Sequence, residues 1–251
     1  MSKKVMLKDS LGNRMKGYEN AYKETLPENF PIIIRLDGSH FHTFTKDLEK
    51  PFDENLISAF WETCKYLAEN IGGAKFVYHQ SDEISILVRN DDNYNTQAWF
   101  KNNLNKLVSI SASLATAKFN EEIRKVYPGK ELATFDSRVF IVPEHEILNY
   151  FVWRQNDAMR NSVSMVAQSM FSHKSLQNQK KDDMVKRMLV ENHFDFFNDL
   201  EIYKQRGACF EKELFDLNLG NGDTVKRSRW EVNLNMPVLT EEKDFLNKFR
   251  K

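Results

Sequence analysis

Apolar positions along the chain repeat with two spacings, which predict strands and helices in turn. The continuous apolar run at residues 32–36 is rich in isoleucine and predicts a buried strand. Residues 53–70 carry apolar side chains at helical spacing, and Gly72-Gly73 ends that helix. Residues 75–79 and 84–88 predict the two strands of a hairpin, joined by Gln80-Ser81-Asp82-Glu83.

A second helix and a fourth strand complete this N-terminal pattern. Residues 97–126 read as one long helix with Phe100, Leu104 and Leu107 on one side, and Pro128-Gly129 ends it. Residues 137–142 predict a strand. The order strand, helix, strand, strand, helix, strand is that of a ferredoxin-like split βαβ unit. We therefore expect an α+β fold with an antiparallel sheet and helices on one face over residues 1–142.

Two acidic turns stand where strands of this unit end. Asp37-Gly38 follows the first strand, and Asp82 lies in the hairpin turn. If the first strand lies beside the hairpin, the two carboxylates converge. Carboxylates held at strand ends can bind a hard divalent cation, and such a site suits phosphoryl transfer. The alternative is that both are ordinary solvated turns.

The C-terminal third has a weaker pattern. A helix is expected from Pro143 towards Phe171, with Trp153, Val163 and Val166 on its apolar face. Beside that face runs a polar stripe, which is either an internal salt-bridge network or a functional surface: Arg154, Asp157, Arg160, Asn161 and Ser164. Basic residues between Lys174 and Val190 offer a phosphate-facing surface. We expect residues 143–251 to form a helical and irregular extension, or to continue the first domain.

Composition sets broad limits. With 251 residues, 41% of them hydrophobic, the chain can bury a sizeable core. Its 36 basic and 36 acidic residues balance, so a polyanionic partner has to meet local basic patches. Two cysteines, Cys64 and Cys209, make neither a disulfide framework nor a zinc site, which favours a reducing cytoplasm. No apolar stretch is long enough to suggest a membrane span.

Seven short motifs occur in a family order: residues 12–19, 35–42, 50–51, 80–83, 135–139, 153–157 and 171–174. No single motif is specific, but together they resemble the tRNA(His) guanylyltransferase superfamily over most of the chain. The sequence looks most like the branch called tRNA(His) guanylyltransferase-like proteins. The resemblance implies a polymerase-palm-like catalytic domain at residues 1–142 and an extension at 143–251 that completes the active site and binds RNA.

The activity that the resemblance implies is extension of RNA from its 5′ end. ATP first activates the 5′-monophosphate of a tRNA, and the 3′-hydroxyl of an incoming nucleoside triphosphate then displaces AMP. The implied cofactors are two Mg²⁺ ions per site, which suit paired carboxylates. ATP and GTP are the implied nucleotide substrates. A tRNA with a truncated or monophosphorylated 5′ end is the implied partner, and the implied assembly is a homotetramer.

The resemblance also assigns residues to these roles. Asp37, Asp82 and the carbonyl of Gly38 would bind the metals, with Glu83 as the third catalytic group. Nucleotide contacts are expected from Gly38, Ser39, His40, Phe41, His42, Lys50, Ser81 and Arg206. RNA contacts are expected from Arg154, Asp157, Arg160, Asn161 and Lys174. The simpler alternatives are a surface lysine at Lys50 and a supporting role for His40, while Asp53 is expected to cap the following helix.

One departure from the family changes the expected substrate. Eukaryotic enzymes that add the extra guanylate to tRNA(His) carry a histidine-isoleucine-asparagine-asparagine run where this chain has Met159 and its neighbours at 158–163. Methionine cannot replace the hydrogen bonds of histidine. Template-dependent 5′-end repair of tRNA is therefore expected, with guanylate addition to tRNA(His) as the alternative. A nucleotide cyclase or small-nucleotide hydrolase and a non-catalytic RNA-binding module are the remaining alternatives.

Overall fold

The computed structural model describes residues 10–91, 95–219 and 223–249. A six-stranded sheet of order β4-β1-β3-β2-β5-β6 forms its centre, and each described strand pair is antiparallel. The strands are β1 (Ile32–Ser39), β2 (Ala74–Gln80), β3 (Glu83–Val88), β4 (Thr134–Ile141), β5 (Ala208–Asn218) and β6 (Thr224–Asn233). The predicted α+β class and antiparallel sheet are confirmed.

Helices cover both faces of this sheet. The helices α3 (Glu54–Asn70) and α4 (Leu104–Val126) lie side by side on one face, where they pack against Ile34 and Leu36 of β1. The other face, which includes Ile33, packs against α5 (Ile147–Met170). Because both faces of β1 are buried at these positions, its sequence is a continuous apolar run and does not alternate. The helices of the predicted palm thus share one face, and the C-terminal region supplies the helix on the other.

Two element boundaries differ from the prediction. Strand β1 continues to Ser39, so Asp37 lies within the strand instead of after it. The predicted helix at 97–126 begins only at Leu104, because Phe100 and Lys101 have left-handed φ angles of 48° and 53° in the 3-10 turn η1 (Trp99–Asn102). Asn103 caps α4 by accepting a hydrogen bond from the amide of Lys106.

The capping role predicted for Asp53 is confirmed. Its side chain accepts hydrogen bonds from the amide of Leu56 at 2.8 Å and from that of Glu49 at 3.2 Å, and the Tyr127 hydroxyl also donates to it at 2.8 Å. These hydrogen bonds and the burial of its side chain show that Asp53 has a structural role. Asp53 therefore fixes the loop that joins α2 (Phe41–Phe44) to α3.

The C-terminal region contains more strand than the prediction of a helical and irregular extension allowed. The 3-10 turn η2 (Glu144–Glu146) precedes α5. After α5 come α6 (His173–Leu176), α7 (Lys181–Asn192), α8 (Phe196–Asp199) and α9 (Ile202–Arg206), and the 3-10 turn η3 (Asn247–Phe249) follows β6. After Gly207, the C-cap of α9, the chain enters β5, which pairs with β2 through Val77↔Phe210 and His79↔Ala208. The sheet thus continues across the predicted boundary at residue 142.

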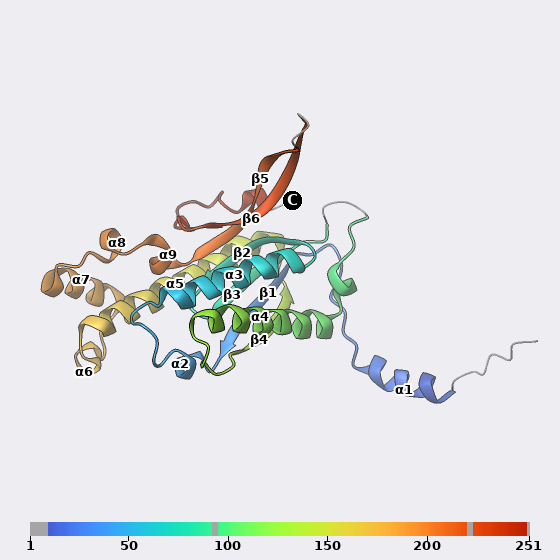
Figure 1. Ribbon diagram of the computed structural model, residues 1–251, viewed down its shortest axis with the longest axis horizontal. Helices are drawn as coiled ribbons and strands as arrows, with labels where there is room; N and C mark the ends of the chain where they lie inside the picture. Colours follow the sequence, from blue (N-terminus) through green and yellow to red (C-terminus); the bar gives the residue numbers. More distant parts are fainter. Residues whose placement is uncertain (1–9, 92–94, 220–222, 250–251) are drawn as a thin grey trace, which may run out of the picture.

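Two elements project from the body of the molecule. The outer parts of β5 and β6 form a two-stranded arm, and α1 (Ser10–Ala21) lies apart from the sheet with no buried residue. Figure 1 shows both at the periphery. In the described residues, no helix combines the length and apolar character needed to cross a membrane.

Candidate active site

The end of β1 and the hairpin turn meet, as the sequence predicted. Asp37 pairs with Glu83 of β3, and the amide of Gly38 donates a hydrogen bond to the carbonyl of Asp82 at 3.0 Å. Strand β1 therefore delivers Asp37 to the same edge at which the turn between β2 and β3 presents Asp82. The two carboxylates come from segments far apart in the sequence and are fixed by backbone hydrogen bonds.

The electrostatics of these carboxylates disfavour their charged forms. Burial raises the pKa of Asp37, and repulsion from Asp136 raises it further, while Arg35 and Arg154 lower it. Burial also raises the pKa of Asp82, to which Asp37 adds repulsion. Asp136 lies opposite Asp37 on β4. Such a group of repelling acids is stabilised in its ionised form when a cation binds.

Glu83 has a different environment from the other two acids. Its Oε2 accepts a hydrogen bond from Nη1 of Arg154 at 2.8 Å and lies 3.9 Å from Nε of Arg35. Burial raises the pKa of Glu83, and Arg154 opposes that shift. Ser85 is 3.4 Å from Oε1 of Glu83 and 2.7 Å from the hydroxyl of Tyr150. Glu83 is thus an anchor for α5, whose Arg154 is itself buried.

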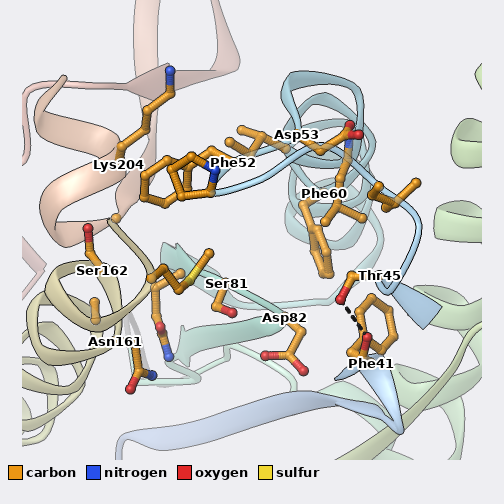
Figure 2. A pocket seen from close by; sticks show the side chains of 18 of the residues that line it. Phe41, Thr45, Phe52, Asp53, Phe60, Ser81, Asp82, Asn161, Ser162 and Lys204 are labelled. Atoms are coloured by element: carbon orange, nitrogen blue, oxygen red, sulfur yellow. Dashed lines mark hydrogen bonds between the residues drawn. The ribbon is translucent and has the colours of Figure 1, made fainter. Parts of the chain in front are cut away.

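A cavity of 610 Å³ opens beside Asp82, between α2, α3, α5 and α9. Figure 2 shows the Asp82 carboxylate facing this space from below, with Asn161 of α5 on one side, Phe41 and Phe60 on the other, and Lys204 above. Apolar side chains such as Phe52 and Met165 also line it. A cavity of this size, with apolar walls and a few convergent polar groups, fits a small-molecule ligand such as a nucleotide.

Several predicted nucleotide contacts lie at this cavity. His42, Lys50, Ser81 and Asn161 line it, and Nζ of Lys50 donates to the carbonyl of Thr45 at 2.8 Å. Asn161 was predicted as an RNA contact, and it lies here instead on the wall of the nucleotide-sized cavity.

Four predicted nucleotide contacts follow Asp37 directly in the sequence, and two of them, Gly38 and Phe41, pack against each other. Phe41 is buried among Phe44, Phe60 and Phe119 and reaches the cavity only as part of its wall. A Cβ on Gly38 would lie 2.2 Å from the ring of Phe41, so only glycine allows this packing. His40 is exposed and has a φ of 58° at the start of α2, while Ser39 ends β1.

Four other predicted contacts lie elsewhere or have other partners. The guanidinium of Arg206 donates from Nε to the carbonyl of Met236 at 2.7 Å and is not part of the cavity wall. Lys174 is exposed on α6. Arg160 is exposed and pairs with Asp157, which also lies 3.5 Å from Nη1 of Arg154. The polar stripe of α5 is therefore in part the internal salt-bridge network that the sequence left open.

The sequence reasoning missed four residues near the site. Lys204 and Tyr203 line the cavity, and Lys204 pairs with Glu54 at 2.5 Å. Asp136 and Arg138 flank Asp37 on β4, with Nη1 of Arg138 3.9 Å from the Asp37 carboxylate. The signal for the second pair was present, because alternate residues of a strand share one face and residues 135–139 stood among the seven family motifs.

The oxygen donors at this edge fit a magnesium ion that also binds phosphate. Residues 10–91, 95–219 and 223–249 contain no group of three or more His, Cys, Asp or Glu side chains able to hold a metal by themselves. Mg²⁺ in nucleotide sites is bound by one or two carboxylates, water and substrate phosphates. Asp37 and Asp82 both have raised pKa values, and Asp37 forms a long ion pair of 3.9 Å with Arg138. The two carboxylates match that smaller donor set.

Comparison with known proteins places this geometry in a family. The family described as tRNAHis guanylyltransferase, Thg1, matches residues 12–143. A bacterial tRNA(His) guanylyltransferase-like protein solved in complex with ATP has 52% sequence identity and a TM-score of 0.89, over 96% of this chain and 99% of that chain. Its counterpart solved in complex with GTP has 50% identity and a TM-score of 0.79 over the same shares.

A curated relative extends the similarity to a named enzyme. The tRNA(His) guanylyltransferase of Debaryomyces hansenii is 27% identical over 225 residues, which are 82% of this chain and 82% of that protein. The family match spans more than half of the chain and includes both acidic segments. This chain belongs to the tRNA(His) guanylyltransferase (Thg1) family of nucleotidyltransferases.

Proposed function

We propose that this protein is a template-dependent 3′-to-5′ nucleotidyltransferase that repairs the 5′ end of tRNA. The observation that carries the proposal is the position of Asp82, which lines a cavity of nucleotide size and is joined through the backbone to the strand that carries Asp37. Similar bacterial proteins have been solved in complex with ATP and with GTP, which supports both nucleotides as substrates. A soluble enzyme of tRNA would act in the cytoplasm, where the buried thiols of Cys64 and Cys209 stay reduced.

Asp37, Asp82 and the carbonyl of Gly38 would hold two Mg²⁺ ions. When bound, Mg²⁺ neutralises phosphate charge and activates the attacking and leaving oxygens. The backbone hydrogen bond between Gly38 and Asp82 keeps the two carboxylates in a fixed relation. Glu83 would then orient Arg154 and would not bind a metal ion, because its carboxylate is already bound to Arg154.

The cavity would hold the nucleotide by charge at one end and apolar contact at the other. Lys50 and His42 lie on the α2 side of the wall, where they can meet the negative phosphates. Phe52, Phe60 and Met165 provide surface on which a purine base can pack. Lys204 lies at the opposite rim, where it forms an ion pair with Glu54. A bound phosphate could take the place of Glu54 as the partner of Lys204.

The α5 wall supports repair over addition of the extra guanylate. Ala158, Asn161 and Ser162 line the cavity, so part of the segment that departs from the eukaryotic run faces the space in which a nucleotide would bind. Met159 of the same segment has no side-chain hydrogen-bond donor. Selection of the incoming nucleotide would therefore come from pairing with the template base of the acceptor strand.

Assembly would complete the tRNA-binding surface. Helix α1 buries none of its residues and exposes Leu11, Met15 and Tyr18. An isolated helix of this length is marginal in water. We therefore expect α1 to pack against another copy in a homotetramer.

The deciding experiment uses a labelled tRNA transcript that lacks its first nucleotide. We expect incubation with ATP, GTP and Mg²⁺ to give products longer at the 5′ end, and a templated cytosine to direct addition of G. The same reaction with a truncated tRNA(His) and a truncated non-histidine tRNA, each with matched and mismatched template bases, separates the two candidate activities. Strong preference for the GUG anticodon together with indifference to the template base would establish guanylate addition to tRNA(His) instead.

A further inference from the structure

Trp153 is a large aromatic side chain that the structure leaves open to solvent. The sequence placed it on the apolar face of α5 with Val163 and Val166, but those two are buried while Trp153 is 50% exposed. Single exposed apolar residues are common and usually need no explanation. Trp153 differs from them because its ring is fixed by groups that also touch the acids of the active site.

The contacts of the indole define which side is open. The guanidinium carbon of Arg154 lies 3.5 Å from the ring centre, and Arg154 itself is only 5% exposed. The solvent-facing half of the indole is therefore on the side away from Arg154. Arg35 lies 5.7 Å from the ring centre, and Tyr150 meets it edge-on at 5.9 Å. Arg154 and Arg35 both also approach Glu83, so the ring is held against the catalytic edge.

The surface around Trp153 has the character of a nucleic-acid contact. The exposed positions of α5 include Asn149, Trp153, Asn156 and Arg160, at three- and four-residue steps along one side. Across from them, Arg138 of β4 is exposed beside Asp37. Aromatic, amide and basic side chains in one strip match surfaces that bind single-stranded nucleic acid by stacking and phosphate contact.

This strip and the nucleotide cavity lie on different sides of α5. Ser162, which lines the cavity, is nine residues after Trp153, and that step turns the helix by about 180° from the starting direction. A nucleotide in the cavity and a strand over Trp153 would thus reach the edge at Asp37 and Asp82 from two sides. Transfer between two bound substrates needs such opposed approaches.

We propose that Trp153 stacks against the base of the 5′-terminal nucleotide of the RNA, with the terminal phosphate directed to Asp37. The proposal rests on the nucleotidyltransferase function proposed above and names the residue that positions its RNA substrate. Arg154 supports the ring from behind by cation–π contact and supplies no phosphate contact of its own, because it is buried on Glu83. Stacking accepts any base, so Trp153 would position the RNA end without selecting its sequence.

The test measures RNA binding without ATP, so that it does not depend on turnover. The probe is a 3′-fluorescein RNA hairpin with a 5′-monophosphate, in one form with an intact 5′-terminal base and in another with an abasic 5′-terminal residue. Fluorescence polarisation gives Kd for the native protein, Trp153→Leu and Trp153→Phe. The matched control is Phe197→Leu, because Phe197 of α8 is 49% exposed and lies away from the sheet edge. Binding of GTP is measured in parallel.

The expected result is a loss that depends on the base. Trp153→Leu should weaken binding of the intact hairpin by about tenfold or more, Trp153→Phe by less, and Phe197→Leu by less than twofold. For the native protein, removal of the terminal base should raise Kd by as much as Trp153→Leu does with the intact hairpin. Trp153→Leu should bind the intact and the abasic hairpin with the same Kd. GTP affinity should stay within twofold.

Three outcomes would overturn the proposal. The first is that Trp153→Leu binds the RNA hairpin with unchanged Kd. The second is that removal of the 5′-terminal base raises Kd equally for the native protein and for Trp153→Leu. The third is that Trp153→Leu loses GTP affinity in parallel, which would mark a structural role or a site for the free nucleotide. If Trp153→Leu does not fold, Trp153→Phe with the two hairpins gives the same comparison. Extension of tRNA by the native protein is assayed separately, so failure of the proposed function appears there and not in the binding data.

Discussion

The amide of Gly38 donates a hydrogen bond to the carbonyl of Asp82 at 3.0 Å and so joins the strand that carries Asp37 to the turn that carries the second carboxylate. This bond fixes the relation of the two acids through backbone atoms. The carboxylates themselves make weaker contacts, a 3.9 Å ion pair of Asp37 with Arg138 and a hydrogen bond of Asp82 with Ser81, which a ligand can replace. Substitutions at either carboxylate should therefore affect chemistry much more than folding.

Asp82→Asn should lose nucleotide addition by a factor of at least 100 and keep or raise its melting temperature in buffer without Mg²⁺. The pKa of Asp82 is raised by burial and by Asp37, so the neutral amide relieves a cost that the native carboxylate carries at pH 7. The checks are the rate of tRNA extension and thermal melting with and without Mg²⁺. Asp37→Asn should behave in the same way.

Asp47→Asn is the matched control for these variants, because Asp47 is a surface acid paired with Lys130. It should keep normal extension. Near-normal activity of Asp82→Asn or of Asp37→Asn would contradict the assignment of the two acids to the metals.

Arg154→Met should destabilise the protein strongly, because it removes the hydrogen-bonded partner of the buried Glu83 and leaves only Arg35 at 3.9 Å. Breaking a buried ion pair on one side costs about 3–5 kcal/mol. The double variant Glu83→Gln with Arg154→Met should lose less stability than the sum of the two single variants. Urea unfolding measures all three. Lys65→Met, which breaks a surface pair with Glu62, should cost about 1 kcal/mol or less, and an equally small effect of Arg154→Met would show that the buried pair is not structural.

Lys50→Met should raise the apparent KM for GTP by about tenfold or more, because one charge-assisted contact with the phosphates is worth about 1.5–3 kcal/mol. Its Nζ already points along the α2 loop, where it donates to Thr45. Steady-state kinetics at saturating RNA gives the value. Lys46→Met is the control, because Lys46 is an exposed lysine of the same loop that does not line the cavity. Equal KM values for the two variants would return Lys50 to the role of a surface lysine.

The stability of the protein should fall as the pH decreases from about 6.5 to about 4 through the protonation of His79 in the unfolded chain. Burial lowers the pKa of His79 to about 4 in the folded protein, against a usual value near 6.5. Between these values the unfolded state binds more protons, so the free energy of unfolding rises with pH by about 3 kcal/mol in total.

The comparison with His79→Phe isolates this contribution, since phenylalanine can keep the stacking on Phe60. Carboxyl groups with raised pKa values have the opposite effect, because their contribution to stability is present at low pH and is lost as the pH rises. These groups are present in both proteins, so their contribution cancels in the comparison. The difference between native protein and variant should therefore change over this pH range. A constant difference from pH 4 to 7 would contradict the assignment.

The sequence predicted the first four strands and the meeting of Asp37 with the hairpin turn. Strand runs such as Ile32 to Leu36 carry their signal locally, and the split βαβ order then determines which ends are neighbours. The start of α4 could not be predicted, because the left-handed turn at Phe100 and Lys101 breaks the helical pattern without a glycine or proline. A strand was expected to begin after Gly207, but the full length of β5 and the presence of β6 were not predicted, because charged residues interrupt the apolar pattern along an exposed arm.

Side-chain contacts were harder to predict than positions along the strands. Arg154 looked like a phosphate ligand from its type alone, but its role depends on Glu83, which is distant in sequence. Arg206 looked similar because it precedes Gly207, and its guanidinium instead binds the carbonyl of Met236. Contacts of this kind depend on how the C-terminal segment crosses the sheet, and a single sequence contains no local signal for that path.

The C-terminal strand that joins β2 has a consequence for when the enzyme becomes competent during its synthesis. One wall of the cavity comes from residues 41–82, and another comes from Tyr203, Lys204 and Gly207, which are held in place by the hydrogen bond from Tyr78 to the carbonyl of Arg206 at 2.6 Å. A nascent chain that has emerged from the ribosome only as far as β4 carries Asp37 and Asp82 but lacks that wall. Binding of a nucleotide in this cavity would thereby be delayed until the last third of the chain has been translated and has paired with β2.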